Sequence, residues 1–240
     1  MAKNPPPRKG NRRFATVIVI VAVVGVAALG YAVSQPREQA RVIDPNTPLP
    51  KPLGHVMGSD SAPVEITMFG DFECPTCGQF TAVTEPDVRS RIVGPGLARF
   101  RYLDFVIPGH KNSPIAHNAA WCAGAQGKFW EMHDQIYEHQ TDWSDLVQGK
   151  DAGHPERTMQ DYAKAVGVDM DKYNACMQNR DFELQIRANA QEGERLGING
   201  TPTIIVGKHV LPAGSAPYDM IKAYVDTATA EAKAAATKKP

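Results

Sequence analysis

Residues 64–77 read VEITMFGDFECPTC and decide which fold we expect. The apolar, β-branched run at 64–69 is typical of a strand, and Cys74 and Cys77 follow it one helical turn apart. At the start of a helix, unpaired backbone N–H groups and the helix dipole favour a thiolate at Cys74, and Pro75 suits the first turn. The pattern therefore predicts a reversible disulfide. Half of a zinc site or a small structural bridge are the alternatives.

Residues 14–33 carry no charge over twenty positions, which is the length that a helix needs to cross a bilayer. The preceding residues, 1–13, hold five basic side chains and no acidic one. The positive-inside rule then predicts a cytoplasmic N-terminus and an extracytoplasmic domain. A cleaved secretory signal is the alternative, because Ala28, Gly30 and Ala32 leave a cleavage site possible. Both interpretations export the domain, whereas a buried core helix is rarely so uniformly apolar.

Residues 34–53 contain five prolines and no apolar periodicity, so we interpret them as an extended linker. The remaining residues, 54–240, are long enough for one domain with a sizeable core. The net charge of the chain is zero, but the charges are unevenly distributed, since residues 14–240 hold 21 basic and 26 acidic side chains. A domain with a slight negative charge lacks the basic patch that nucleic-acid binding requires.

The rest of the sequence predicts a sheet interrupted by a long helical segment. A helix from Cys74 is expected to end near residue 93, where Gly94 begins a Gly-Pro-Gly stop, and a strand at 97–106 completes a βαβ unit with parallel strands. We expect three to five helices within the insert at about 113–196. The sheet then resumes, and the expected elements are strands at 203–206 and 209–211, a last helix at about 216–228, and a tail that frays.

With Thr201-Pro202 placed ahead of a strand, this order of elements resembles the thioredoxin superfamily, and most closely its DsbA-like branch. The resemblance covers about residues 54–228 and implies an α/β, thioredoxin-like fold with a helical insertion, preceded here by one transmembrane helix. It implies that Pro202 is cis and that the Thr201 backbone receives an extended substrate peptide. It also implies that Cys74 is the nucleophile and that Cys77 resolves the mixed disulfide.

The chain departs from the family pattern between the two cysteines and at Met68. The two residues between the cysteines lack the histidine of strongly oxidising DsbA proteins, and Glu73 disfavours a thiolate next to it, so we expect a less extreme oxidant. Met68 stands where many relatives carry a buried carboxylate that moves the proton of the second thiol. Asp71 or a water substitutes for that carboxylate, or Cys77 is deprotonated without assistance. Asp71 is otherwise a loop residue that caps the helix, and we favour the cap.

Cys122 and Cys176 stand singly on two expected helices of the insert. An even cysteine count in an exported domain favours a bridge between them, and two buried free thiols are the alternative. The seven histidines show no metal-ligand spacing, and we expect them, like the three tryptophans, to be packing or surface residues rather than parts of a metal or binding site.

Together these features predict a membrane-anchored, extracytoplasmic thiol–disulfide oxidoreductase that passes a disulfide to exported cysteine-containing proteins. A reductase or isomerase of the same fold is the first alternative, and a metal-binding chaperone module for copper or zinc is the second. No cofactor is expected because the sulfurs carry the chemistry themselves. A membrane redox partner is implied by the resemblance alone.

Overall fold

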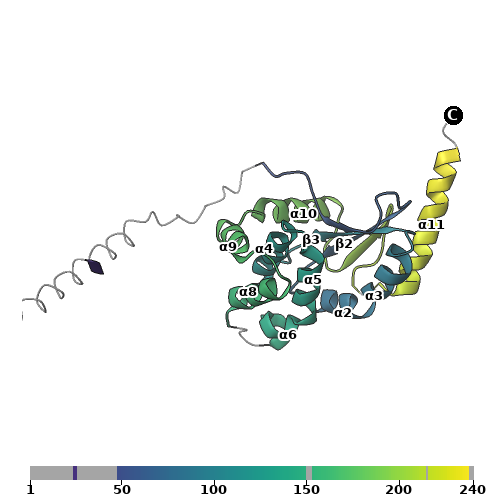
Figure 1. The fold of residues 1–240 in the computed structure, drawn as a ribbon. Coiled ribbons are helices and arrows are strands. Elements are labelled where there is room, and N and C mark those ends of the chain that lie inside the picture. Colours follow the sequence, from purple (N-terminus) through teal and green to yellow (C-terminus); the bar gives the residue numbers. More distant parts are fainter. Residues whose placement is uncertain (1–23, 26–47, 150–152, 215, 238–240) are drawn as a thin grey trace, which may run out of the picture. The chain divides into compact units, whose positions relative to one another are not determined.

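The computed structural model describes residues 24–25, 48–149, 153–214 and 216–237 (Figure 1). The basic segment at 1–13, nearly all of the expected span at 14–33 and most of the linker at 34–53 lie outside the described residues. Within the described ranges, no helix is both long and apolar enough to cross a membrane. The described residues from 48 onward belong to one compact unit, which is described by itself below.

A five-stranded sheet forms the centre of this unit, in the order β1-β3-β2-β4-β5. Strands β2 and β3 pair in parallel, as the βαβ pattern predicts, and the other neighbours are antiparallel. Strand β1 was not expected from the sequence, because three residues are too short for a recognisable alternation. The strands are β1 (His55–Met57), β2 (Glu65–Gly70), β3 (Arg99–Asp104), β4 (Thr203–Val206) and β5 (His209–Val210).

The helix that begins after Cys74 is shorter than the sequence analysis expects. Its first part is α2 (Pro75–Val83), followed by the single turn α3 (Glu85–Val88) and the π-helical turn η1 (Arg89–Val93). Pro86 explains the break, because proline has no N–H to continue the hydrogen-bond ladder of the preceding helix. The expectation of one continuous helix over 74–93 was therefore wrong.

Seven helical segments, rather than three to five, lie between β3 and β4 in the described part of the insert. Two of them, α6 and α7, have four residues each and are too short to produce a 3.6-residue periodicity. The segments are α4 (Ser113–Gly124), α5 (Phe129–Glu138), α6 (Gln140–Trp143), α7 (Asp145–Gln148), α8 (Pro155–Ala165), α9 (Met170–Asn179) and α10 (Glu183–Arg195).

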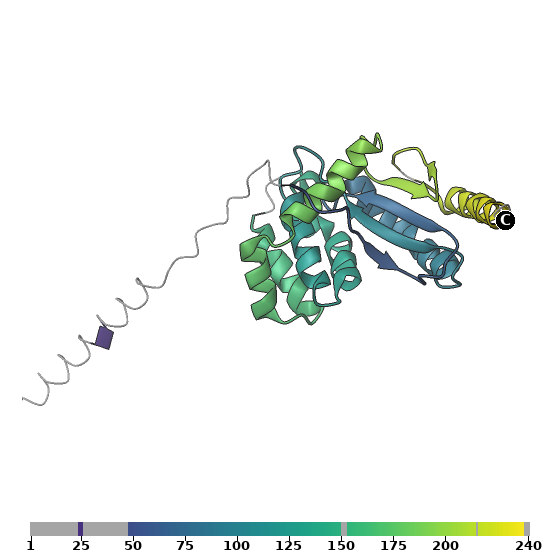
Figure 2. The same ribbon diagram turned by 90° about the horizontal axis from the view of Figure 1, so that it is seen from above.

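The last helix, α11, spans Tyr218–Thr237 and is longer than the expected helix at 216–228. Beyond Ala228 the sequence is rich in alanine and lysine and contains no glycine or proline before residue 240, so its intrinsic helix propensity carries the helix on without burial. In Figure 2 most helices of the insert lie toward one end of the sheet and α11 lies toward the other end, where it contacts α3 and β4.

Alternation along the central strands divides the core between the two faces of the sheet. Ile66 and Met68 of β2 join the larger apolar cluster, which includes α2, α4, α5 and α11. Phe69 belongs to a second cluster on the opposite face, which packs beside α10. A Cβ on Gly193 of α10 would lie 2.6 Å from the Phe105 ring, so glycine allows this helix to approach the sheet closely.

Candidate active site

Cys74 and Cys77 lie at the carboxyl end of β2, at the start of α2. Cys74 is the N-cap residue, and Pro75 opens the helix. Both cysteines are free thiols. Cys74 is 7% exposed, whereas Cys77 is completely buried. The local sequence thus produces one thiol near the surface and a second thiol behind it, one turn into the helix.

The segment before β4 brings Thr201 and Pro202 to this pair. The Thr201–Pro202 peptide bond is cis. The carbonyl oxygen of Thr201 lies 3.4 Å from the sulfur of Cys74 and accepts its hydrogen bond when the thiol is protonated. Because β4 pairs antiparallel with β2, its first residues lie beside the carboxyl end of β2. The structure therefore brings together the four residues that the sequence analysis names for catalysis and substrate binding.

The two thiols differ sharply in acidity. The hydrogen bond from Cys77 lowers the pKa of Cys74 most, burial opposes it, and the Thr201 side chain and the N–H groups of Cys77 and Thr76 add to the lowering, which brings this pKa to about 5. Burial raises the pKa of Cys77 well above its ordinary value, and the neighbouring Cys74 raises it further. The reduced site therefore holds a thiolate at Cys74 and a protonated thiol at Cys77 at neutral pH.

Asp71 does not cap α2, so this expectation from the sequence was wrong. Its carboxylate instead joins three segments: it accepts hydrogen bonds from the Glu73 N–H and the Ser113 hydroxyl on Oδ1, and from the Ile107 N–H and His110 Nδ1 on Oδ2, all within 2.8 Å. Burial alone would raise the pKa of Asp71, but these hydrogen bonds, led by that from His110, lower it. Asp71 is a buried, ionised junction behind the active-site loop.

The carboxylate of Glu73, which was expected to disfavour a thiolate at Cys74, is bound to the start of α4. Its Oε2 accepts hydrogen bonds from the N–H groups of Asn112 (2.8 Å) and Ser113 (3.0 Å), at the beginning of α4. Its Oε1 is buried and has no hydrogen-bond partner among the described residues. Burial raises the pKa of Glu73 above its usual value. The residue before the nucleophile therefore fastens the active-site loop to the first helix of the insert.

A second buried hydrogen-bond network extends from this loop to the carboxyl end of β3. The Phe72 N–H donates to His117 Nε2, and His117 Nδ1 lies 2.5 Å from Asp104 Oδ1. Asp104 Oδ2 also accepts from Trp121 (2.8 Å) and from Asn189 (2.6 Å). These donors lower the pKa of Asp104 against the effect of its complete burial. No sequence pattern predicted the network, because its members are spread over 118 positions and follow no common motif.

Gln140, in the short helix α6, holds the active-site loop from the insert. Its Nε2 donates to the carbonyl oxygens of Phe72 (2.7 Å) and Cys74 (3.0 Å). A Cβ on Gly78 would lie 2.6 Å from Gln140 Oε1, so glycine at this position lets α6 reach the loop. No sequence signal identified Gln140, since a lone glutamine is usually a surface residue.

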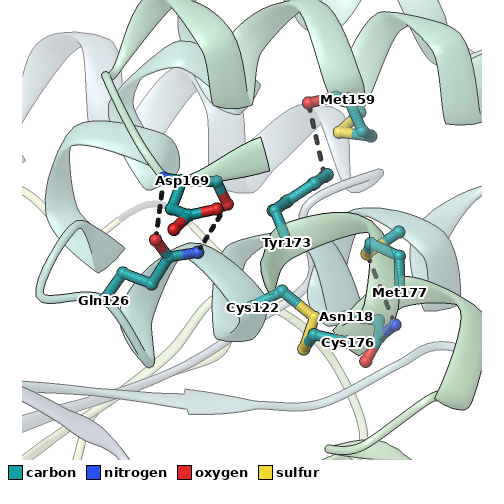
Figure 3. The surroundings of a disulfide bond; sticks show 8 residues. All are labelled: Asn118, Cys122, Gln126, Met159, Asp169, Tyr173, Cys176 and Met177. Carbon is teal, nitrogen blue, oxygen red and sulfur yellow. Dashed lines mark hydrogen bonds between the residues drawn. A yellow bond between two sulfur atoms is a disulfide. The ribbon is translucent and has the colours of Figure 1, made fainter. Parts of the chain in front are cut away.

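The remaining two cysteines are joined to each other. Figure 3 shows the disulfide between Cys122 of α4 and Cys176 of α9. Beside it, the Gln126 side chain accepts from the Asp169 N–H (2.8 Å) and donates to the Asp169 carbonyl (3.2 Å). The bridge and this side-chain contact fix α4 to the start of α9, within the insert.

Potential metal ligands come together in the described part of the chain at Glu85, His133 and Asp134, away from the cysteine pair. The Arg89 guanidinium already pairs with both carboxylates, at 2.6 Å from each. A basic side chain therefore occupies the position between the two acids, and the cluster is an internal ion pair.

The fold and this site define the chain as a thioredoxin-fold protein with a dithiol beside a cis-proline. A family model described as thioredoxin matches residues 51–227. The chain belongs to the thioredoxin family.

The similar proteins include long antiporters, which match over part of their length, and disulfide bond formation proteins, which match over most of theirs. The Na⁺/H⁺ antiporter NhaA 1 of Salinispora arenicola is 30% identical over 80% of this chain, but the match spans only 29% of that protein. Disulfide bond formation protein D of Bacillus subtilis is 25% identical over 71% of this chain and 75% of that protein. The oxidised crystal structure of BdbD from Bacillus subtilis has the same fold, with a TM-score of 0.65 at 24% identity, covering 76% of this chain and 97% of that chain.

Proposed function

We propose that this chain is an extracytoplasmic thiol–disulfide oxidoreductase of the DsbA type, which transfers the Cys74–Cys77 disulfide to exported proteins. The unequal pair of thiols carries this proposal. A thiolate at Cys74, whose pKa is lowered to about 5, stabilises the reduced enzyme, and this makes the enzyme's own disulfide a better oxidant. The relative from Bacillus subtilis that is named for disulfide bond formation supports the same reaction class.

The reaction proceeds by two thiol–disulfide exchanges. A substrate thiolate attacks Cys74 Sγ, the Cys74–Cys77 bond breaks, and Cys77 leaves and takes up a proton. A second substrate thiolate then attacks the substrate sulfur of the mixed disulfide and releases Cys74 as a thiolate. The substrate loses two electrons and gains a disulfide, and the enzyme gains both electrons. A membrane protein with an electron-accepting disulfide is the partner that we propose for reoxidation.

Substrate is proposed to bind as an extended segment along Thr201, whose carbonyl oxygen faces Cys74 Sγ. Main-chain recognition of this kind depends little on side chains, which suits an enzyme with many substrates. Antiporter activity is not transferred to this chain from its longer relatives, since the match spans only 29% of the Salinispora arenicola protein.

The reaction is tested by mixing the oxidised full-length chain with a reduced, unfolded disulfide protein and counting the substrate disulfides by mass. Wild type is expected to form disulfides and Cys74→Ser is expected to form none. Equal oxidation by both would refute the proposal. Equilibrating the Cys74–Cys77 pair with glutathione buffers gives its reduction potential and distinguishes the reaction directions. A reduction potential of about −120 to −180 mV would support a disulfide donor or isomerase, and a value of about −270 mV would support a reductase.

Location and the metal-chaperone alternative need separate measurements. In intact cells, a membrane-impermeant thiol reagent is expected to label reduced Cys74, and labelling only after lysis would contradict an extracytoplasmic domain. Copper or zinc retained in a 1:1 ratio by the purified chain, and lost in a variant lacking Cys74 and Cys77, would favour the metal-binding module instead.

A further inference from the structure

The loop between β3 and α4 places a histidine against the carboxylate behind the active site. His110 Nδ1 lies 2.8 Å from Asp71 Oδ2, and the imidazole is 16% exposed. The backbone of the same loop also binds Asp71, through the Ile107 N–H at 2.8 Å. His110 is therefore held in a fixed position while it keeps access to protons from solvent.

Asp71 connects this histidine to the nucleophile. The Cys74 N–H donates to the Asp71 carbonyl oxygen at 3.1 Å, and the Asp71 carboxylate accepts the Glu73 N–H at 2.8 Å. The hydrogen bond with Asp71 raises the pKa of His110 most, burial opposes it, and the negative charges of Asp71, Cys74 and Glu73 raise it further. The imidazole is thus a cation over a wider pH range than an isolated histidine.

The charges around His110 come from every neighbouring element. Asp71 and Glu73 lie in the loop before α2, and Cys74 caps that helix. Lys111 follows His110 in its own loop and is exposed. From α4, His117 Nε2 lies 3.9 Å from Asp71 Oδ1, while its Nδ1 binds the buried Asp104. From α7, Asp145 accepts a hydrogen bond from Asn112, two positions beyond His110. Carboxylates therefore dominate these surroundings, which favours an imidazolium.

We propose that His110 supplies the positive charge that stabilises the Cys74 thiolate, so that a loop distant in sequence provides what the Pro75-Thr76 spacer lacks. This inference deepens the proposed function and rests on it for its biological meaning. His110 is a positioning residue and does not touch the substrate. Its charge stabilises the reduced enzyme and leaves the uncharged disulfide unaffected, which makes the disulfide more oxidising.

If His110 acts through its charge, its effect on the Cys74 thiolate depends on pH differently than if it acts only through its hydrogen bond to Asp71. The charge acts only where Cys74 is a thiolate and His110 is protonated, between the pKa of Cys74 at about 5 and the raised pKa of His110. Above the pKa of His110, the imidazole is neutral and its effect on the thiolate disappears. A purely structural contribution from the hydrogen bond to Asp71 has no such upper limit.

The test compares His110→Gln with wild type in the full-length chain. Glutamine keeps an N–H donor for Asp71 and removes the titratable charge. His209→Gln is the matched control, because His209 Nε2 likewise pairs with a carboxylate, that of Glu231 at 3.1 Å, but lies on β5. The Cys74–Cys77 equilibrium with glutathione and the ultraviolet absorbance of the thiolate are measured at about pH 6 and about pH 9, on either side of histidine titration.

For His110→Gln at the lower pH, we expect the equilibrium to move about threefold or more toward the oxidised enzyme, with the thiolate absorbance appearing at higher pH. At the higher pH the difference is expected to vanish. His110→Lys should retain most of the wild-type behaviour, and His209→Gln should match wild type throughout. An unchanged equilibrium in His110→Gln, or an equal change at both pH values, would overturn the proposal.

A second measurement needs no variant that must fold. Because coupling between two sites is reciprocal, the imidazole of His110 should titrate at a higher pH in the reduced enzyme than in the oxidised one, as followed by nuclear magnetic resonance. Identical titrations in the two states would also refute the coupling. Both measurements use only the chain's own cysteines, so a failure to oxidise substrate proteins would leave their results intact.

Discussion

The sulfur of Cys74 lies 3.4 Å from the carbonyl oxygen of Thr201, a residue 127 positions further along the chain. We propose that an extended substrate peptide pairs with the Thr201 backbone, which would place it beside the nucleophile. Cys77 lies one turn further into the helix and is completely buried. We propose separate roles for the two cysteines on this basis, and the first prediction tests them.

Cys77→Ser is expected to accumulate mixed disulfides with disulfide-containing substrate proteins, because its Cys74 thiolate can still attack a substrate disulfide in the reverse direction, but the serine hydroxyl cannot then break the Cys74–substrate bond. The complexes would be detected by non-reducing electrophoresis and mass spectrometry and would disappear on reduction. Cys74→Ser is the matched control and should trap nothing. Normal turnover by Cys77→Ser would contradict the assignment of Cys77 as the resolving cysteine.

Alkylation of reduced Cys74 should reach half its maximal rate near pH 5, because the thiolate is the reactive form and the pKa of Cys74 is lowered to about 5. The rate should fall below that pH and stay nearly constant above it, where a free cysteine would instead have its midpoint near about pH 8.5. Rates are followed by peptide mass spectrometry. Cys77→Ala should move the midpoint upward, since Cys77 is the largest cause of the shift, and a midpoint at the ordinary thiol value in wild type would refute the depressed pKa.

Gln140→Ala is expected to reduce the free energy of unfolding by about 1–3 kcal/mol, because the buried Phe72 carbonyl oxygen loses its 2.7 Å hydrogen bond. Disulfide transfer should also slow, since the Cys74 carbonyl loses the same donor. Urea denaturation and the substrate-oxidation assay measure the two effects. Gln160→Ala, at an exposed position of α8, is the control and should change stability by less than roughly 0.5 kcal/mol. Equal effects of the two substitutions would show that Gln140 does not support the loop.

Replacing both Cys122 and Cys176 with alanine should lower the free energy of unfolding by about 2–4 kcal/mol, because the bridge closes a loop between positions 54 residues apart. The Cys74–Cys77 reduction potential should stay the same, since the bridge lies within the insert. Chemical denaturation and glutathione equilibration provide the two readouts. A large change in potential without a change in stability would mean that this disulfide takes part in the redox reaction.

Much of the architecture could be predicted from local sequence. The run at 64–69 and the Gly-Pro-Gly stop after residue 93 predicted a strand, a helix and a parallel second strand. Element lengths were less certain, because they depend on weaker effects. Pro86 interrupts the helix that the sequence predicted to be continuous over 74–93. Helix α11 continues beyond the predicted end because its last residues have high intrinsic helix propensity, although they do not pack against the core.

The candidate site divides in the same way. Cys74, Cys77, Thr201 and Pro202 lie in short motifs whose spacing or neighbours reveal them. Gln140 and the network around Asp104 have no such motif, and their roles depend on which segments the fold brings together. Asp71 shows the difference most clearly: its position in sequence suggested a helix cap, but the loop after β3 supplies better hydrogen-bond donors.

Local sequence was enough to predict a dithiol site, because a Cys-x-x-Cys pair at a helix start provides the thiols and the helix N-terminus in one segment. The surroundings of those thiols depend on the tertiary fold. Burial separates the acidities of Cys74 and Cys77, and the loop before α4 brings His110 to Asp71. Acidity depends on desolvation and on charges a few ångströms away, and these are properties of residues distant in the chain that become neighbours only on folding.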